Sequence, residues 1–132
     1  MIDLKRVDHI GVVVEDLATA SSFLTSVFGL VQSKSLERED LRAAFFRCGD
    51  ASVELVEYRD PDERARRLPP GAPARLDHIA IEIDDVGETL ASLEAAGVVT
   101  QGPPRATAAG TSVWTDGKTS GGVVYQLVQV AR

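Results

Sequence analysis

Apolar and polar positions alternate along residues 7–14 and again along residues 76–83. One alternating face is apolar throughout, with Ile10, Val12 and Val14 in the first segment and Ile79, Ile81 and Ile83 in the second. A β-branched run with a period of two predicts a strand that buries one face. We therefore expect a strand in each segment, with its isoleucine and valine face covered by a helix.

A helix is predicted directly after each of these strands. In the first copy, Asp16 is a typical N-cap, and Gly29 follows the last apolar position and ends the helix. In the second copy, Asp85 and Glu88 form a capping-box pair, and Gly97 ends the helix. Helical spacing relates the apolar positions, which are Leu17, Ala20, Leu24, Val27 and Phe28 in the first and Val86, Leu90 and Leu93 in the second.

Three further strands are predicted after each helix. They lie near residues 31–36, 42–48 and 52–58 in the first half and near residues 98–102, 110–115 and 122–129 in the second. The run Asp116-Gly117-Lys118 predicts a hairpin turn. Residues 59–75 contain four prolines and mixed charges, a composition that predicts a partly extended linker.

Each half of the chain therefore has the predicted element order β-α-β-β-β. We expect an α+β fold in which two tandem modules, residues 4–60 and 75–131, form a curved, partly open eight-stranded β-sheet cleft. The helices lie on the outside of this sheet, and residues 59–75 join the modules. A chain of 132 residues is long enough for one ordinary domain with a sizeable core, so we expect a single domain over residues 1–132.

The two halves are also repeats of one another in sequence. Residues 7–17 read Val-Asp-His-Ile-Gly-Val-Val-Val-Glu-Asp-Leu, and residues 76–86 read Leu-Asp-His-Ile-Ala-Ile-Glu-Ile-Asp-Asp-Val. A constant offset in so short a chain indicates two copies of one supersecondary unit. Each copy places a histidine, His9 or His78, at the same point of a strand. If the copies pack with pseudo-twofold symmetry, the two imidazoles converge on one point.

The last strand of each half supplies a partner for these histidines. Glu54 and Gln126 stand between apolar neighbours that would pack toward the helix, so we expect both to point the other way, beside His9 and His78. A carboxylate in such a strand is costly unless it is paired or bound to a metal. The four side chains together form a mixed N/O ligand set that suits one divalent Zn, Co, Ni, Mn or Fe ion. The alternative is that both histidines are packed, hydrogen-bonded strand residues.

Charge and composition exclude several classes of partner. The net charge of −6 argues against nucleic acid, whose phosphates favour a basic surface. No run approaches about 20 apolar residues, so no membrane span is expected. The single cysteine, Cys48, cannot form an internal disulfide, and a reducing cytoplasm is the simplest location. A basic cluster at Arg64, Arg66 and Arg67 is interleaved with acidic residues; it is either a solvated linker or a phosphate contact for an anionic ligand.

The paired Asp-His-Ile repeats, the β-α-β-β-β units and the closing segment 121–127, Gly-Gly-Val-Val-Tyr-Gln-Leu, resemble the vicinal oxygen chelate superfamily. This group includes glyoxalase I, methylmalonyl-CoA epimerase, extradiol dioxygenases and bleomycin-resistance-type binding proteins. The resemblance runs from Leu4 to Val128 and is greatest to the epimerases. It implies a homodimer and a metal held by four residues, which are the four derived above: His9, Glu54, His78 and Gln126.

Two positions depart from the epimerase pattern. Epimerases of this type generally end with a glutamate where this chain has Gln126, and some have glutamine at the position of Glu54, so the acid and the amide have exchanged places. The epimerase glutamate of the stretch Glu-Gln-Gly-Val-Arg aligns with Arg38. The proton-transfer pair is therefore not intact. Glu54 is the candidate metal-adjacent base, and Glu37 or Glu39 is the candidate opposite partner.

The resemblance implies a metal-dependent isomerase or epimerase that abstracts a proton alpha to a carbonyl or thioester of a small molecule, such as an acyl-CoA. Three alternatives stay open: a lyase of the glyoxalase I kind, a dioxygenase-like activity of Fe(II), and a non-enzymatic protein that sequesters a ligand, as resistance proteins do. The ion itself could be Co, Ni, Zn, Mn or Fe.

Overall fold

The computed structural model describes residues 1–131, and contacts divide the chain into two compact units. One unit is His9–Asp77, and the other combines Met1–Asp8 with His78–Arg132. Two strands, β1 (Leu4–Val14) and β5 (Ala74–Ile83), each contribute residues to both units. The element order along the described residues is β-α-β-β-β twice, with one additional short helix between the repeats, as predicted for an α+β fold with eight strands.

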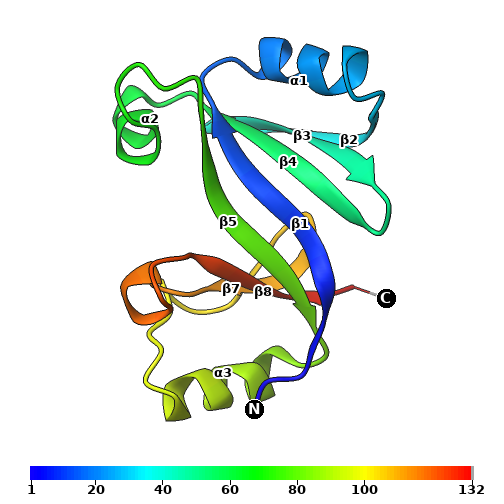
Figure 1. The fold of residues 1–132 in the computed structure, drawn as a ribbon. Coiled ribbons are helices and arrows are strands. Elements are labelled where there is room, and N and C mark those ends of the chain that lie inside the picture. Colours follow the sequence, from blue (N-terminus) through cyan, green and yellow to red (C-terminus); the bar gives the residue numbers. More distant parts are fainter. Residues whose placement is uncertain (132) are drawn as a thin grey trace. The chain divides into compact units, whose positions relative to one another are not determined.

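In the unit His9–Asp77 the strand order is β2-β3-β4-β1, with α1 packed on one face (Figure 1). The elements are α1 (Leu17–Ser26), β2 (Val31–Glu37), β3 (Leu41–Cys48) and β4 (Ala51–Tyr58). Strand β4 pairs parallel with β1 and antiparallel with β3, which pairs antiparallel with β2. The buried core between sheet and helix comprises Val14, Ala44, Phe46 and Leu55, with Val12, Leu17, Ala20 and Leu24 packed against it.

Helix α1 begins after the predicted cap Asp16 but ends at Ser26, so Val27 and Phe28, which were predicted to belong to its apolar stripe, lie beyond it and are exposed. Asp16 accepts a hydrogen bond from the Thr19 N–H at 3.0 Å, which satisfies one of the unpaired donors of the first turn. The carboxylate of Glu57 on β4 accepts another from the Leu17 N–H at 2.9 Å. Gly29 has a φ of +68°, a conformation that favours glycine and turns the chain toward β2.

In the other unit the strand order is β5-β8-β7-β6, with α3 (Val86–Ala95) beside β7 and β8. The strands are β6 (Arg105–Ala106), β7 (Gly110–Trp114) and β8 (Tyr125–Val130), and β8 is parallel to β5 and antiparallel to β7. Asp85 accepts from the Glu88 N–H, as the capping box predicts. The core comprises Ile83, Val113 and Leu127, with Ile81, Val86, Leu90 and Tyr125 packed against it.

Two local predictions in the second half of the chain differ from the structure. Residues 98–102 are not a strand; only Thr100 forms an isolated bridge, to Thr115, and the edge strand is β6. Pro103 and Pro104 lack the N–H that a ladder needs, so pairing begins after them. The predicted hairpin turn at 116–118 is a 3₁₀ turn over Gly117–Thr119.

Residues 59–75 are less extended than their composition predicts, because they contain the helix α2 (Pro61–Arg67). Asp60 accepts from the Asp62 N–H, and Pro61 occupies the first turn, where its missing N–H costs nothing. Acidic residues in the first turn and arginines in the last turn complement the helix dipole. Among the three α-helices found in residues 1–131, none has the length and apolar character of a membrane span.

The core of the unit His9–Asp77 predicts a large difference between two phenylalanine truncations. Phe46 is fully buried and Phe28 is 62% exposed. We expect Phe46→Ala to lower the free energy of unfolding by about 3–5 kcal/mol, because it leaves a cavity. The matched change Phe28→Ala should cost less than about 1 kcal/mol in the same urea titration. Equal losses in the two variants would contradict this assignment of the core.

Candidate functional site

His9 and Glu54 meet on the face of the β1–β4 pair that is opposite to α1. In the parallel register His9 stands opposite Ser52, and Gly11 stands opposite Glu54. Because side chains alternate across a strand, this face is the one that does not carry Val12, Val14 and Leu55. His9 Nε2 lies 3.3 Å from Glu54 Oε1. The structure therefore brings together the two predicted site residues of this unit.

The His9–Glu54 pair is largely removed from solvent. The side chain of His9 is 2% exposed and that of Glu54 is 15% exposed. Phe45 stands opposite Glu54 in the β3–β4 register, and its ring meets the His9 imidazole edge to face at 5.7 Å. An edge-to-face contact of this kind favours the observed orientation of the imidazole.

The separation of these two atoms suits a shared metal ion. Ligand atoms at about 2.0–2.1 Å from a tetrahedral Zn²⁺ lie about 3.3–3.4 Å from one another. A direct N–H···O hydrogen bond is most favourable at an N···O distance of about 2.9 Å. Imidazole nitrogen and carboxylate oxygen are also the ligand types that Zn, Co, Ni, Mn and Fe accept. The donor set of His9 and Glu54 thus fits a divalent ion of this group.

Gln126 occupies the equivalent strand position in the other unit. It stands opposite Ala80 on β5 and opposite Trp114 on β7, and it is buried. Its Nε2 donates to Ser112 Oγ at 2.8 Å, so the amide oxygen is the atom that can serve as a ligand. His78 lies two residues before Ala80 and therefore on the same strand face. Sequence reasoning missed Ser112, since only the β7–β8 register places it beside Gln126.

Glu37 and Glu39, the predicted opposite partners of Glu54, lie elsewhere. Glu37 pairs with Arg42 across β2 and β3, and its Oε1 accepts from Arg42 Nε at 3.1 Å and Arg59 Nη2 at 2.9 Å. Arg42 in turn stands opposite Glu57 on the face that carries α1. The structure does not bring Glu37 to Glu54. Glu39 is exposed in the turn between β2 and β3, and its role stays a prediction.

Arg38, which replaces the epimerase glutamate, is also in this turn. Its guanidinium donates two hydrogen bonds to the Asp40 carboxylate, at 3.0 and 2.8 Å. These bonds hold the pKa of Asp40 below its usual value. Arg38 is therefore engaged in a local surface ion pair rather than with Glu54.

The arginine cluster of residues 64–67 bonds to residues of α2, β4 and β5, and one of these bonds joins Arg67 to Asp77. Arg66 and Arg67 both donate to Glu63, and these bonds lower the pKa of that carboxyl group. Arg64 donates two hydrogen bonds to the carbonyl oxygen of Tyr58. The cluster therefore lies on the helix α2 with protein partners, whereas the first reading of its sequence was a solvated linker; the alternative, a phosphate contact, stays a prediction.

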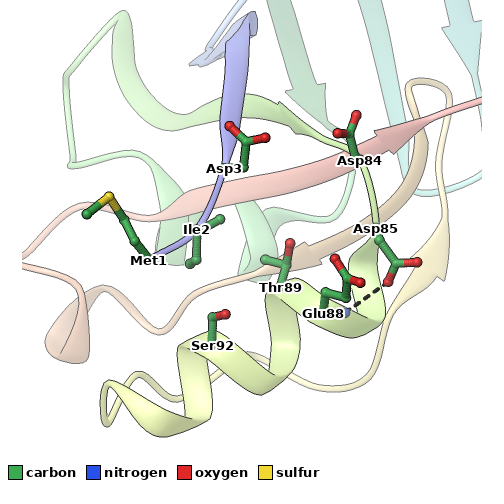
Figure 2. A pocket seen from close by; sticks show the side chains of 8 residues that line it. All are labelled: Met1, Ile2, Asp3, Asp84, Asp85, Glu88, Thr89 and Ser92. Atoms are coloured by element: carbon green, nitrogen blue, oxygen red, sulfur yellow. Dashed lines mark hydrogen bonds between the residues drawn. The ribbon is translucent and has the colours of Figure 1, made fainter.

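A separate pocket of about 140 Å³ lies beside α3 (Figure 2). It is lined by Met1, Ile2, Asp3, Asp84, Asp85, Glu88, Thr89 and Ser92. Lys5 bridges two of its carboxylates, Asp3 at 2.6 Å and Asp84 at 2.9 Å. Asp85 is engaged as the N-cap of α3 through the Glu88 N–H. Three acidic residues of this pocket, Asp3, Asp84 and Asp85, thus have structural partners.

Comparison with family models shows to which superfamily this chain belongs. The model of the glyoxalase/bleomycin resistance protein/dioxygenase superfamily matches residues 8–115, which is most of the chain. The chain belongs to this superfamily. The match includes His9, Glu54 and His78 and confirms the resemblance seen in the repeats. Gln126 lies beyond the matched residues.

Solved structures of similar fold include methylmalonyl-CoA epimerases. The epimerase of Mycobacterium tuberculosis is 21% identical, with a TM-score of 0.88 over 98% of this chain and 90% of that chain. A Streptomyces coelicolor epimerase variant in complex with 2-nitronate-propionyl-CoA is 24% identical, with a TM-score of 0.85 over 98% of this chain and 100% of that chain. At these identities the likeness shows the fold. The uncharacterized protein YqjC of Bacillus subtilis (strain 168) is 30% identical over 92 residues, which are 68% of this chain and 66% of that protein.

The Gln126–Ser112 hydrogen bond predicts a specific loss of stability. Ser112→Ala would leave the buried Gln126 Nε2 without this acceptor, and we expect a cost of about 1–3 kcal/mol in the free energy of unfolding. Thr111→Ala, an exposed neighbour on β7, is the control and should change stability by about 0.5 kcal/mol or less. Urea denaturation followed by circular dichroism measures both. A loss in Thr111→Ala as large as that in Ser112→Ala would argue against the bond.

Proposed function

We propose that this protein is a metal-dependent isomerase or epimerase that removes a proton alpha to a carbonyl or thioester group. The observation that carries the proposal is the buried His9–Glu54 contact at 3.3 Å. A carboxylate and an imidazole in this arrangement can hold a cation and exchange a proton with a substrate. Membership of the superfamily and the fold of the epimerases support this choice of reaction.

We assign four ligands to the metal, as the sequence repeat predicts: His9, Glu54, His78 and Gln126. In support, His9, Glu54 and His78 are a group of described side chains that each offer an atom able to hold a metal ion. Gln126 is assigned from its equivalence to Glu54 in the repeat, since it stands opposite Ala80 as Glu54 stands opposite Gly11. The chemistry that such an ion supplies is Lewis-acid stabilisation of negative charge on a carbonyl oxygen.

Within this proposal, the Glu54 carboxylate takes the proton from the alpha carbon. Gly11, which stands opposite Glu54 and has no side chain, favours a close approach of the substrate to that carboxylate. Low exposure of Glu54 and the neighbouring Phe45 ring keep water away from the proton in transfer. The substrate in this account is a small molecule, and an acyl-CoA is the class suggested by the epimerase complexes. The homodimer and the cytoplasmic location expected from the sequence complete the proposal.

The proposal predicts that Glu54→Gln strongly slows proton exchange at the alpha carbon. Methylmalonyl-CoA incubated with the wild-type protein in deuterated water should incorporate deuterium, as followed by mass spectrometry. Loss of the base should slow this exchange by about 10²–10⁴-fold. Glu57→Gln is the control, because Glu57 lies on the same strand, faces α1 and undergoes the same chemical change.

Exchange by Glu54→Gln at the wild-type rate would remove Glu54 from the mechanism. Failure of the wild-type protein to exchange the alpha proton of any acyl-thioester tested would contradict the epimerase itself. Exchange that survives in Glu57→Gln and is lost in Glu54→Gln is the expected result.

A further inference from the structure

Two basic residues share the strand face of His9 and Glu54. Lys34 on β2 stands opposite Phe45, which stands opposite Glu54. Arg47 on β3 stands opposite Ser52, which stands opposite His9. Residues that stand opposite one another across paired strands point to the same face of a sheet. Lys34 and Arg47 therefore lie on the site face, although neither was singled out from the sequence.

A continuous set of contacts joins Lys34 to the site. Its ammonium group lies 4.6 Å above the centre of the Phe45 ring, and the same ring meets the His9 imidazole at 5.7 Å. Arg47 is two residues beyond Phe45 on the same strand face, a spacing of about 7 Å. Both basic side chains are exposed, so a solute can reach them. The two cations thus flank Phe45 within the unit His9–Asp77.

Arg47 differs from the other arginines of this sheet in its partners. Arg38, Arg42 and Arg59 donate to the carboxylates of Asp40 and Glu37. Among the described residues, Arg47 has one hydrogen-bond partner, the carbonyl oxygen of Gly49 at a long 3.5 Å. Most donors of its guanidinium therefore remain available to a ligand, and a planar guanidinium suits carboxylate and phosphate groups.

The other unit repeats this cation–aromatic arrangement. The Arg105 guanidinium lies 4.4 Å from the centre of the Trp114 ring, and Trp114 stands opposite Gln126. In both units, then, an aromatic side chain opposite the assigned metal ligand carries a cation over its ring. A net charge of −6 would repel an anionic solute. Cations on the site face reduce this repulsion locally.

We propose that Lys34 and Arg47 bind an anionic group of the substrate, a carboxylate or a phosphate, and so select acidic substrates for the site. This inference rests on the proposed function, because it names the substrate class of that site. Lys34 supplies a point charge above Phe45, and Arg47 supplies a fork of N–H donors. Binding here would place the anionic end of the substrate beside the His9–Glu54 pair.

Calorimetric titration with two probes, malonate and coenzyme A, tests the proposal. The titrations use the purified full chain at low ionic strength with a chelator present, so that no metal ion contributes. We expect the wild-type protein to bind at least one probe. Lys34→Met combined with Arg47→Met should weaken that binding about tenfold or more, because two charge-assisted contacts are lost. Arg66→Met, which removes an exposed arginine of α2, should leave the affinity within about twofold.

A loss for malonate identifies a carboxylate as the bound group, a loss for coenzyme A identifies a phosphate, and either supports the proposal. Unchanged affinity of the double variant for both probes, or no binding of either probe by the wild-type protein, overturns it. Because binding is measured without turnover, a failed deuterium-exchange assay would overturn the epimerase and leave this result standing.

Discussion

The account depends on a carboxylate and an imidazole that are buried side by side in a sheet. Taking Glu54 out of water in a strand of valines and leucine is costly unless a partner compensates the charge. The parallel register of β1 and β4 provides that partner, because it places His9 one strand away on the same face, with Nε2 3.3 Å from Glu54 Oε1. This distance suits two ligands of one ion, which is why we treat the pair as a candidate metal site.

The same strands divide their polar residues between chemistry and structure. On β4, Glu54 faces His9, whereas Glu57, three residues later, points to the other face and accepts the first N–H of α1. On β8, Gln126 faces away from α3, whereas Gln129 accepts the Val86 N–H at 3.0 Å. Each unit thus uses one polar residue of its last strand to start its helix and another to serve the site face.

Much of this could be predicted from the sequence, because it follows from local periodicity. The alternation of Ile10, Val12 and Val14 assigns the helix face, and Asp16 and Asp85 locate the helix starts. That His9 and Glu54 share one face of the sheet follows from alternation once the β-α-β-β-β order is known. The repeat adds His78 and Gln126 by equivalence, and their place in a metal site stays a prediction.

The parts that could not be predicted depend on register and on local caps. A register shift between Gln32 and Lys34 sets which residues of β2 point to which face, so Lys34 joins the site face and Glu37 pairs with Arg42. The sequence does not indicate that Ser112, Lys34 and Arg47 lie near the site, because their positions depend on which residues stand opposite them on neighbouring strands. The edge strand β6 begins after Pro103 and Pro104, later than predicted. Asp60 caps a helix in a segment whose composition predicted a linker.

The most direct measurement is anomalous diffraction from crystals grown with Mn²⁺ or Co²⁺. The account predicts one strong anomalous peak within about 2.0–2.3 Å of both His9 Nε2 and Glu54 Oε1, as expected for direct coordination. An ordered His9–Glu54 pair with no peak beside it, while the ion binds elsewhere on the chain, would contradict the account.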